Sequence, residues 1–566
     1  DPEVRLAARA AENPTASRAH LELADLHLSR GEPRALERSL VAAVEAGAPT
    51  AALTAAIDLR SGRTELEPFR LQARDVIREF ERSGVTVEGT AARVLDYAAL
   101  FVRADGSSRM LEHEIVRIQS AEAASKLAEH RALEGDVLHL RVIKRDGSVL
   151  EPEVIAGKPT VTLPHLEIGD YVETEQILAS AGDGRGARYA GPRWFFREEN
   201  VGYARSELVL ISPKSRPLVV ETTGLVPEPS VEERDGLVIR RFRVDESPPA
   251  PVEPGSAPLA EFLPSLTLGW GQSLELRLGA LADAMVQLAP VDPRVERLAR
   301  ELVEGIPARD VEARARRLYR FLAENVEPGE ETDGRRVVFG RHGNLWQGFR
   351  MLCRAAGVPV RFAVAESRLA TPPRGPLSEA QRFTQPVAEV LTPRGSTWLT
   401  LGGKYTPFGW LPSDLRGMRA RLLDGSIGRE VLLPEGGVLD SVELTGKGQL
   451  GADGSLSLEL AQRFTGKLAM QLRRGLDQLP EERLHAVLET QMLAQTFRGG
   501  ELQRHVVERR DELDAPLTIR MTVRVPRFAE RAAGALVITP PFGADLARLA
   551  TLPERRTPLL LSEALH

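Results

Sequence analysis

Apolar residues at helical spacing mark the first eighty or so positions of the chain. Leu21, Ala24 and Leu28 recur at intervals of three and four, a spacing that places them on one face of a helix. Pro33 then suits the first turn of a second helix. We therefore expect residues 1–85 to form a helical domain.

This helical pair resembles one tetratricopeptide unit. The matching residues are Leu23-Ala24, His27, Leu40, Ala43 and Pro49. Because such repeats bury their apolar faces only against neighbours, the segment would be the end of a longer helical array or a helical cap. An unrelated helical hairpin is the alternative interpretation.

Strand-like runs alternate with turns from residue 88 to residue 285. Asp105-Gly106 and Asp146-Gly147 separate alternating apolar and polar runs, which is a strong hairpin signal. We expect an antiparallel β-sandwich domain with one apolar face and one solvated face. The expected strands are 92–102, 138–143, 149–155, 208–211 and 237–244.

Residues 288–428 mix both periodicities, whereas residues 430–566 return to strands. In the third segment the expected helices are 295–303, 310–326 and 345–356, and the expected strands are 360–365, 387–391 and 397–401. In the last segment the expected strands are 455–460 and 517–525, with a helix near 482–495 between them. The fold class is therefore a multidomain α+β protein. The strand-like run 556–561 needs a later partner, so we expect the last domain to be truncated and the natural protein to continue.

Composition excludes several function classes. With 74 basic and 80 acidic residues the net charge is −6, which argues against nucleic acid as a partner. No apolar run is long enough for a transmembrane segment. A single cysteine, Cys353, excludes an internal disulfide or a multi-thiolate metal site. Neither an EF-hand loop nor an H-E-x-x-H motif occurs, and we expect no cofactor and no metal.

Several short motifs follow one another in a set order through the third segment. They are Gly343-Asn344-Leu345, helix 349–356 with Ala356-Gly357-Val358-Pro359, Phe383-Thr384-Gln385, Ser396–Thr400 and Thr406–Pro412. Together they resemble the transglutaminase-like superfamily of papain-type folds. Val94-Leu95-Asp96 and Gly169–Glu173 are similar to the uncharacterised β-domain that precedes such domains in bacterial exported proteins, and Arg555–Leu559 is similar to the β-domain behind them.

The resemblance implies a catalytic triad whose three positions are substituted here. The reaction needs a thiolate, an imidazole that takes its proton and a carboxylate that orients the imidazole. Leu345 stands where the resemblance places the Cys, Gln385 where it places the His and Thr400 where it places the Asp. No histidine occurs between residues 343 and 484, so a shifted alignment supplies no base either.

Cys353 lies eight residues beyond the lost nucleophile position, on the same expected helix. Its apolar neighbours favour a buried structural role over a nucleophilic one. Candidate residues lining the old cleft are His342, Asn344, Trp346 and Trp398. A solvated histidine and core aromatic residues are the plainer interpretations.

These observations predict a non-catalytic, transglutaminase-like pseudoenzyme that binds or scaffolds other proteins. In one version of this hypothesis the cleft binds an extended peptide. In a second version the protein is a structural subunit of a larger bacterial envelope assembly, and the cleft has no role. The alternative is an enzyme, an amide-bond hydrolase or acyl transferase, that uses recruited residues outside the family pattern. From the resemblance we expect an extracytoplasmic, periplasmic protein.

Overall fold

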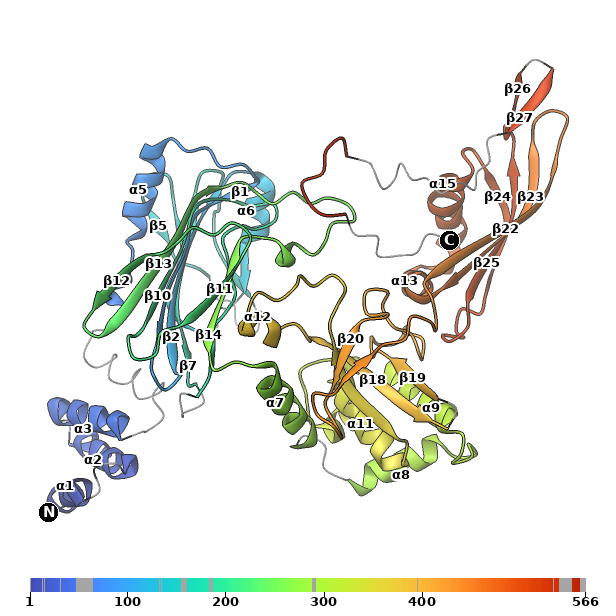
Figure 1. The fold of residues 1–566 in the computed structure, drawn as a ribbon. Helices are drawn as coiled ribbons and strands as arrows, with labels where there is room; N and C mark the ends of the chain where they lie inside the picture. Colours follow the sequence, from blue (N-terminus) through green and yellow to red (C-terminus); the bar gives the residue numbers. More distant parts are fainter. Residues whose placement is uncertain are drawn as a thin grey trace. The chain divides into compact units, whose positions relative to one another are not determined.

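The chain forms two compact units of mixed helices and sheets (Figure 1). The computed structural model describes residues 2–12, 14, 16–30, 32–46, 65–131, 133, 135–153, 160–182, 187–287, 292–393, 395–532, 534–538 and 552–559. Unit 1 comprises the described residues up to Ser273, with Thr371–Glu379 and Arg556–Pro558, and unit 2 comprises the others. The chain is thus a multidomain protein of mixed α and β structure, while its division into four domains stays a prediction.

Unit 1 begins with helices α1 (Pro2–Glu12), α2 (Ser17–Ser29) and α3 (Pro33–Glu45). The expected helical pair is present as α2 and α3, which bury Ala24 and Leu40 in a small shared core. Leu28, expected on the same face, is 58% exposed and is not part of this core, whereas Leu21 packs against it. Pro49 lies outside the described residues.

An eight-stranded sheet follows. Its order is β12 (Ser230–Arg234), β13 (Leu237–Ser247), β10 (Gly202–Pro213), β1 (Ala91–Val102), β2 (Ser108–Ile118), β7 (Tyr171–Ser180), β4 (Asp136–Ile143) and β5 (Val149–Leu150). The expectation of a wholly antiparallel sheet was wrong at one place, since β1 and β10 pair in parallel from Ala92↔Gly202 to Phe101↔Ile211. A long connection between these two strands permits that direction.

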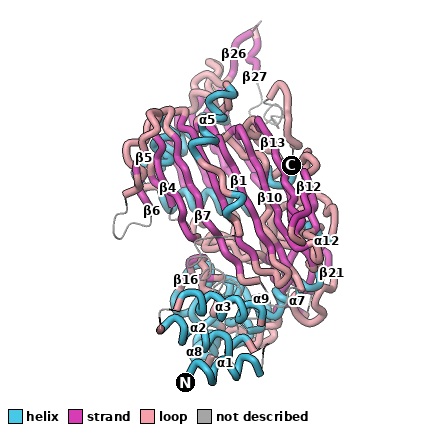
Figure 2. Tube along the Cα trace, turned by 90° about the vertical axis from the view of Figure 1, so that its left-hand side faces the viewer, coloured by secondary structure: helices cyan, strands magenta, loops and turns pink. Residues whose placement is uncertain are grey.

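Both faces of this sheet are covered, so the expectation of one solvated face was also wrong. On one face lie η1 (Glu67–Phe69) and α5 (Ala73–Ser83), and Figure 2 shows α5 in front of this sheet. On the other face lies a smaller sheet of β11 (Val219–Thr223), β14 (Ser265–Trp270), β8 (Tyr189–Ala190) and β9 (Trp194–Phe195). The remaining elements of this unit are α6 (Ala121–Leu127), β3 (Glu129–Arg131), β6 (Thr160–Thr162) and η2 (Leu259–Glu261).

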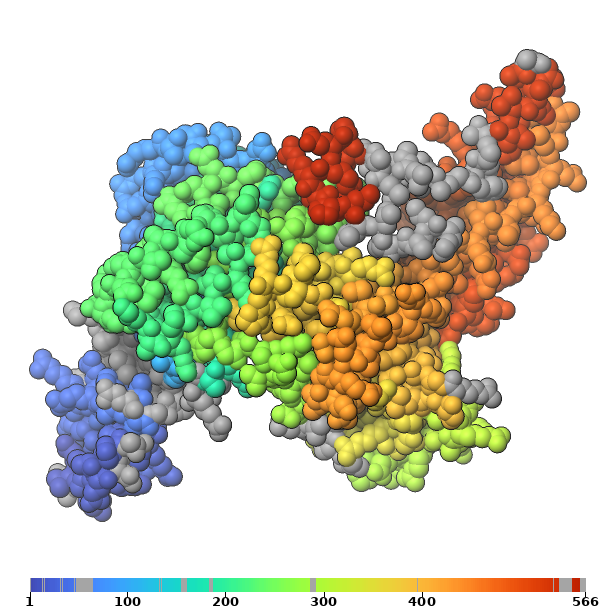
Figure 3. Space-filling model, in the orientation of Figure 1, coloured from blue at the N-terminus to red at the C-terminus, as the bar shows by residue number. Residues whose placement is uncertain are grey.

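Two segments that lie far along the sequence, Thr371–Glu379 and Arg556–Pro558, complete unit 1. The carboxylate of Glu221 accepts hydrogen bonds from the N–H groups of Leu377 and Ser378 at 2.8 and 2.9 Å. The buried Glu253 accepts hydrogen bonds from the N–H groups of Arg556 and Thr557 at 2.7 and 2.9 Å. Figure 3 shows this red C-terminal segment against the green part of the unit. The run near residue 557 was expected to need a later partner, yet it binds an earlier loop.

Unit 2 opens with α7 (Leu274–Gln287), α8 (Pro293–Leu302), α9 (Val311–Asn325), α10 (Gly334–Gly340) and α11 (Leu345–Ala356). A five-stranded sheet has the order β19 (Gly395–Leu399), β18 (Gln385–Thr392), β17 (Val360–Ala365), β20 (Arg419–Leu422) and β21 (Glu430–Leu432). Helix α12 spans Pro376–Ala380, and β15 (Glu327–Pro328) pairs with β16 (His342–Gly343). The expected helix 345–356 and strand 360–365 are both confirmed.

The rest of unit 2 is a four-stranded antiparallel sheet covered by helices. Its order is β22 (Ser441–Leu450), β23 (Leu456–Thr465), β25 (Leu517–Val525) and β24 (Glu501–Glu508). The helices are α13 (Gly466–Gln478), α14 (Glu481–Val487), the π-helical η3 (Leu488–Leu493) and α15 (Ala494–Thr496), and a hairpin of β26 (Ala529–Ala532) and β27 (Ala535–Ile538) follows. The helix expected near 482–495 is present as three consecutive pieces. No helix in the described parts of the chain has both the length and the apolar character to span a bilayer.

Candidate functional site

The start of helix α11 is where the resemblance places a nucleophile. The Asn344 Oδ1 atom accepts hydrogen bonds from the N–H groups of Trp346 and Gln347 at 3.0 and 3.3 Å, which caps the helix. Gly357 ends it with a left-handed φ of 66°. The first helical residue, Leu345, is 5% exposed and belongs to the apolar core beneath the helix. The helix start thus presents a hydrocarbon side chain to the core.

The other two positions meet at one end of neighbouring strands. Ala388 in β18 is paired with Leu399 in β19, so Gln385 and Thr400 lie at the same end of this antiparallel pair. Gln385 is exposed. The Thr400 hydroxyl donates to the Trp410 carbonyl at 3.2 Å. An amide and a hydroxyl in these places supply neither a base nor a charge that would orient one.

Cys353 is the cysteine of α11, and its side chain is fully buried in the core of unit 2. Burial raises the pKa of its thiol far above the ordinary value. Since the thiolate is the reactive form, this cysteine is poorly suited to attack an acyl carbon.

Three of the four residues expected to line a cleft lie at the start of α11 or just before it, whereas Trp398 lies in strand β19. The exposed His342 packs its imidazole closely over Gly329. A side chain at position 329 would clash with it, since an added Cβ would lie 2.1 Å from the ring. Trp346 packs on Phe362 with ring centres 6.3 Å apart. Trp398 belongs to a different apolar cluster from its neighbour Leu399, because successive strand residues point to opposite faces of the sheet. Trp398 therefore lies on the face of the sheet away from α11. The expectation that it lines one cleft together with Trp346 was wrong, since Trp346 packs on the α11 side.

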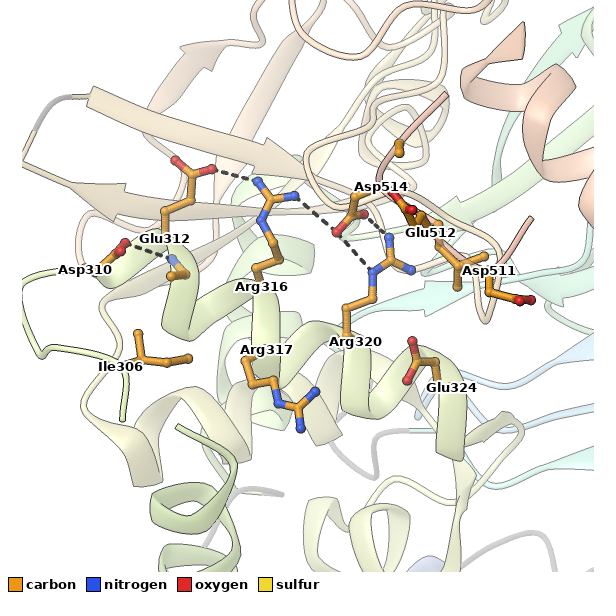
Figure 4. Close-up of a pocket in the computed structure, with 13 residues that line it drawn as sticks. Ile306, Asp310, Glu312, Arg316, Arg317, Arg320, Glu324, Asp511, Glu512 and Asp514 are labelled. Carbon is orange, nitrogen blue, oxygen red and sulfur yellow. Dashed lines mark hydrogen bonds and ion pairs between the residues drawn. The ribbon is translucent and has the colours of Figure 1, made fainter. Parts of the chain in front are cut away.

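A hollow of about 710 Å³ with a charged lining lies beside α9 (Figure 4). Sequence reasoning did not predict it. Its lining carries three guanidinium groups and six carboxylates, namely Arg316, Arg317, Arg320, Asp310, Glu312, Glu324, Asp511, Glu512 and Asp514. Asp514 accepts from Arg316 at 3.1 Å, from Arg320 and from the Phe408 N–H at 2.8 Å. Arg316 also bonds Glu312 at 2.8 Å. With six carboxylates against three guanidiniums, the lining carries a surplus of negative charge.

One buried arginine shapes the wall of this hollow. Arg473 in α13 is 1% exposed. It donates hydrogen bonds of 2.8–3.3 Å to the carbonyls of Arg509, Arg510, Glu512, Leu513 and Ala515. Arg473 therefore adds five hydrogen bonds to those that Asp514 makes, and together they fix the loop that carries Asp514.

Three side chains on the eight-stranded sheet have the chemistry of metal ligands. His139, Glu173 and Glu175 place ligand atoms within 4.8 Å of one another. Each carboxylate already has a cation, however, since Arg141 bonds Glu173 at 2.7 Å and Arg70 bonds Glu175 at 2.7 Å. A divalent ion would have to displace these guanidiniums, so the geometry fits a buried ion-pair network better than a metal centre.

A second hollow, of about 530 Å³, lies in unit 1 and contains a perturbed carboxyl group. Asp96 is buried there and accepts a hydrogen bond from the Ser206 hydroxyl at 2.6 Å. Burial raises the pKa of Asp96 to about 7, although Arg93 lies 3.5 Å away. Sequence reasoning noted Asp96 only within a motif, because a strand pattern does not reveal a desolvated carboxyl.

Comparisons with known proteins leave the family open. No family model and no curated protein matches this chain. Solved structures that resemble it in part include a Parabacteroides distasonis protein described as a candidate protease, at 11% identity over 77% of this chain and 93% of that one, with a TM-score of 0.48. Another is an M1 zinc metallopeptidase of Deinococcus radiodurans, at 13% identity over 32% and 42%, with a TM-score of 0.19. Likenesses at these scores carry no argument about activity.

Proposed function

We propose that this chain is a transglutaminase-like protein that binds other proteins without catalysing acyl transfer, in an extracytoplasmic, periplasmic setting. The observation that carries the proposal is Leu345 at the first position of α11, capped by Asn344. A helix N-terminus lowers the pKa of a thiol placed there. A leucine side chain has no lone pair to activate.

The surroundings of this position support the same interpretation. Gln385 and Thr400 share a strand end but offer neither base nor carboxylate. Recruitment of Cys353 would require a buried thiol to ionise, and burial opposes that. Burial of the thiol thus argues against an enzyme that uses Cys353 as its nucleophile.

The hollow beside α9 supports a binding role. Its volume of about 710 Å³ accommodates several side chains, and its surplus of carboxylates is complementary to lysine and arginine. The bonds made by Arg473 to the neighbouring loop fix this wall in advance, which lowers the entropy lost on binding. A basic, extended segment of a partner protein is the ligand that this chemistry fits.

The test is a crosslinked pull-down from the native cell fraction, with the recovered proteins identified by mass spectrometry. The chain is compared with a variant carrying Glu324→Lys and Asp511→Lys, two exposed residues of the hollow. Glu482→Lys, on the exposed surface of α14, is the matched control.

We expect a stoichiometric protein partner that the control retains and the double variant binds at least about tenfold more weakly, since like charges then face each other. Recovery of this chain alone, as a monomer or as a dimer, would count against a protein that binds other proteins. A partner retained equally by all three chains would place the binding surface elsewhere.

A further inference from the structure

Strand β22 leaves one edge of the four-stranded sheet unpaired among the described residues. Most of its ten residues are exposed. It pairs with β23 from Ser441↔Thr465 to Leu450↔Leu456 without a bulge. At the opposite edge, the ladder of β24 shifts between Leu502 and Arg504. Because bulges protect edges from new pairing, β22 is the more receptive of the two.

The hairpin that follows β22 fixes which of its backbone groups are free. The Gly451 N–H donates to the Ser455 carbonyl at 2.7 Å, so this residue pair is hydrogen-bonded. Hydrogen-bonded positions alternate along an antiparallel ladder. The odd-numbered residues of β22 therefore bond to β23, and the even-numbered residues from Val442 to Gly448 turn their N–H and C=O groups outward.

The charges of β22 are self-complementary in one register. If a second copy of the strand lies antiparallel with Thr445 on the two-fold axis, Glu443 of each copy lies directly opposite Lys447 of the other. Within one chain, Glu443 bonds Arg463 at 3.1 Å and Lys447 is paired in register with Glu459. A row of alternating positive and negative side chains then crosses the joined sheet, and opposite charges across strands are stabilising.

The apolar side chains fit the same register. Val442, 43% exposed, lies opposite Gly448 of the second copy, and Leu444 lies opposite Gly446. Glycine leaves room beside each branched side chain. A shift by two residues either way would put Glu443 opposite Thr445 or Gln449 and would lose both charge pairs.

We propose that β22 is a self-association edge, at which a second copy of this chain pairs antiparallel about Thr445 and joins two four-stranded sheets into one of eight strands. The outward N–H and C=O groups of Val442–Gly448 form the new ladder, and the Glu443–Lys447 pairs set its register. This inference concerns a different surface from the hollow beside α9 and does not depend on it.

The experiment is sedimentation velocity of the full chain across a concentration series at low salt, with each variant checked by circular dichroism. Glu443→Lys or Lys447→Glu alone creates two like-charge contacts across the axis, and each should weaken the dimer at least about tenfold. The double variant Glu443→Lys with Lys447→Glu restores opposite charges and should recover dimerisation. Arg524→Glu is the matched control for Lys447→Glu, because it also replaces an exposed positive charge with a negative one. It lies on the central strand β25 and should leave the dimer unchanged.

Rescue in the double variant is the outcome that a merely local effect of either charge would not produce. A chain that stays monomeric at every concentration overturns the proposal. So does a dimer that neither single reversal weakens, because it would use another surface.

Discussion

Replacing the buried Arg473 with methionine should destabilise unit 2 and loosen the wall of the hollow beside α9. Arg473 is 1% exposed and is the hydrogen-bond donor to five backbone carbonyls in residues 509–515. Methionine fills similar space but donates nothing, so these carbonyls lose a charged donor. Hydrogen bonds to charged groups contribute about 1.5–3 kcal/mol each.

The five bonds are not additive, since they share one side chain and the exposed parts of the loop regain water. A loss of about 3–5 kcal/mol in the free energy of unfolding is therefore expected. For a domain of this size each kcal/mol lowers Tm by about 2–4 °C, so the transition of unit 2 should fall by about 10 °C.

Differential scanning calorimetry measures this change, and Arg474 provides the matched control. It is the adjacent residue of α13, is exposed, and its guanidinium lies 5.9 Å from the ring centre of Tyr405. Arg474→Met should cost less than about 1 kcal/mol. Equal melting temperatures for the two variants would refute the reasoning, because the buried hydrogen bonds of Arg473 would then contribute nothing to the free energy of unfolding.

Three further predictions concern other groups. The pKa of Asp96 rises from 3.8 to about 7 on folding because its carboxyl is buried. The folded state therefore holds more protons than the unfolded state between these values, and the free energy of unfolding falls as pH rises from about 4 to 7. Asp96→Asn should reduce this pH dependence in urea unfolding at pH 4.5 and 7.5, and an unchanged dependence would contradict the argument. Cys353 should resist iodoacetamide in the native state and react only as fast as the chain unfolds, measured by intact mass; rapid native labelling would show it is accessible. Glu253→Ala should speed tryptic cleavage next to Thr557, which its carboxylate holds, whereas an unchanged cleavage rate would mean that the segment is held by other contacts.

Local signals predicted the helix and the strand around position 345 well. The helix expected over 345–356 is α11, and the strand expected over 360–365 is β17. N-caps, left-handed glycines and alternation act within a few residues, so they are visible in the sequence.

Features that depend on distant partners were not predictable in this way. The parallel pairing of β1 with β10 joins residues such as Ala92 and Gly202, and no local pattern specifies it. Helix α13 was missed because it continues directly from strand β23 through Gly466 at φ 60°, without a turn signal. The carbonyls that bury Arg473 lie 36–42 residues further along the chain, so its sequence neighbours give no indication of its role.

The central claim is that the chain lacks acyl-transfer chemistry. The most direct measurement incubates the purified protein with a glutamine-containing acyl-donor peptide and a labelled primary amine, then follows amine incorporation and any acyl adduct by intact mass spectrometry. Our account predicts incorporation at the uncatalysed rate and no adduct, both in the native chain and in Cys353→Ala, because Leu345 stands where the resemblance places the nucleophile. Turnover above background in either chain would contradict it, and its loss in Cys353→Ala would identify Cys353 as the nucleophile.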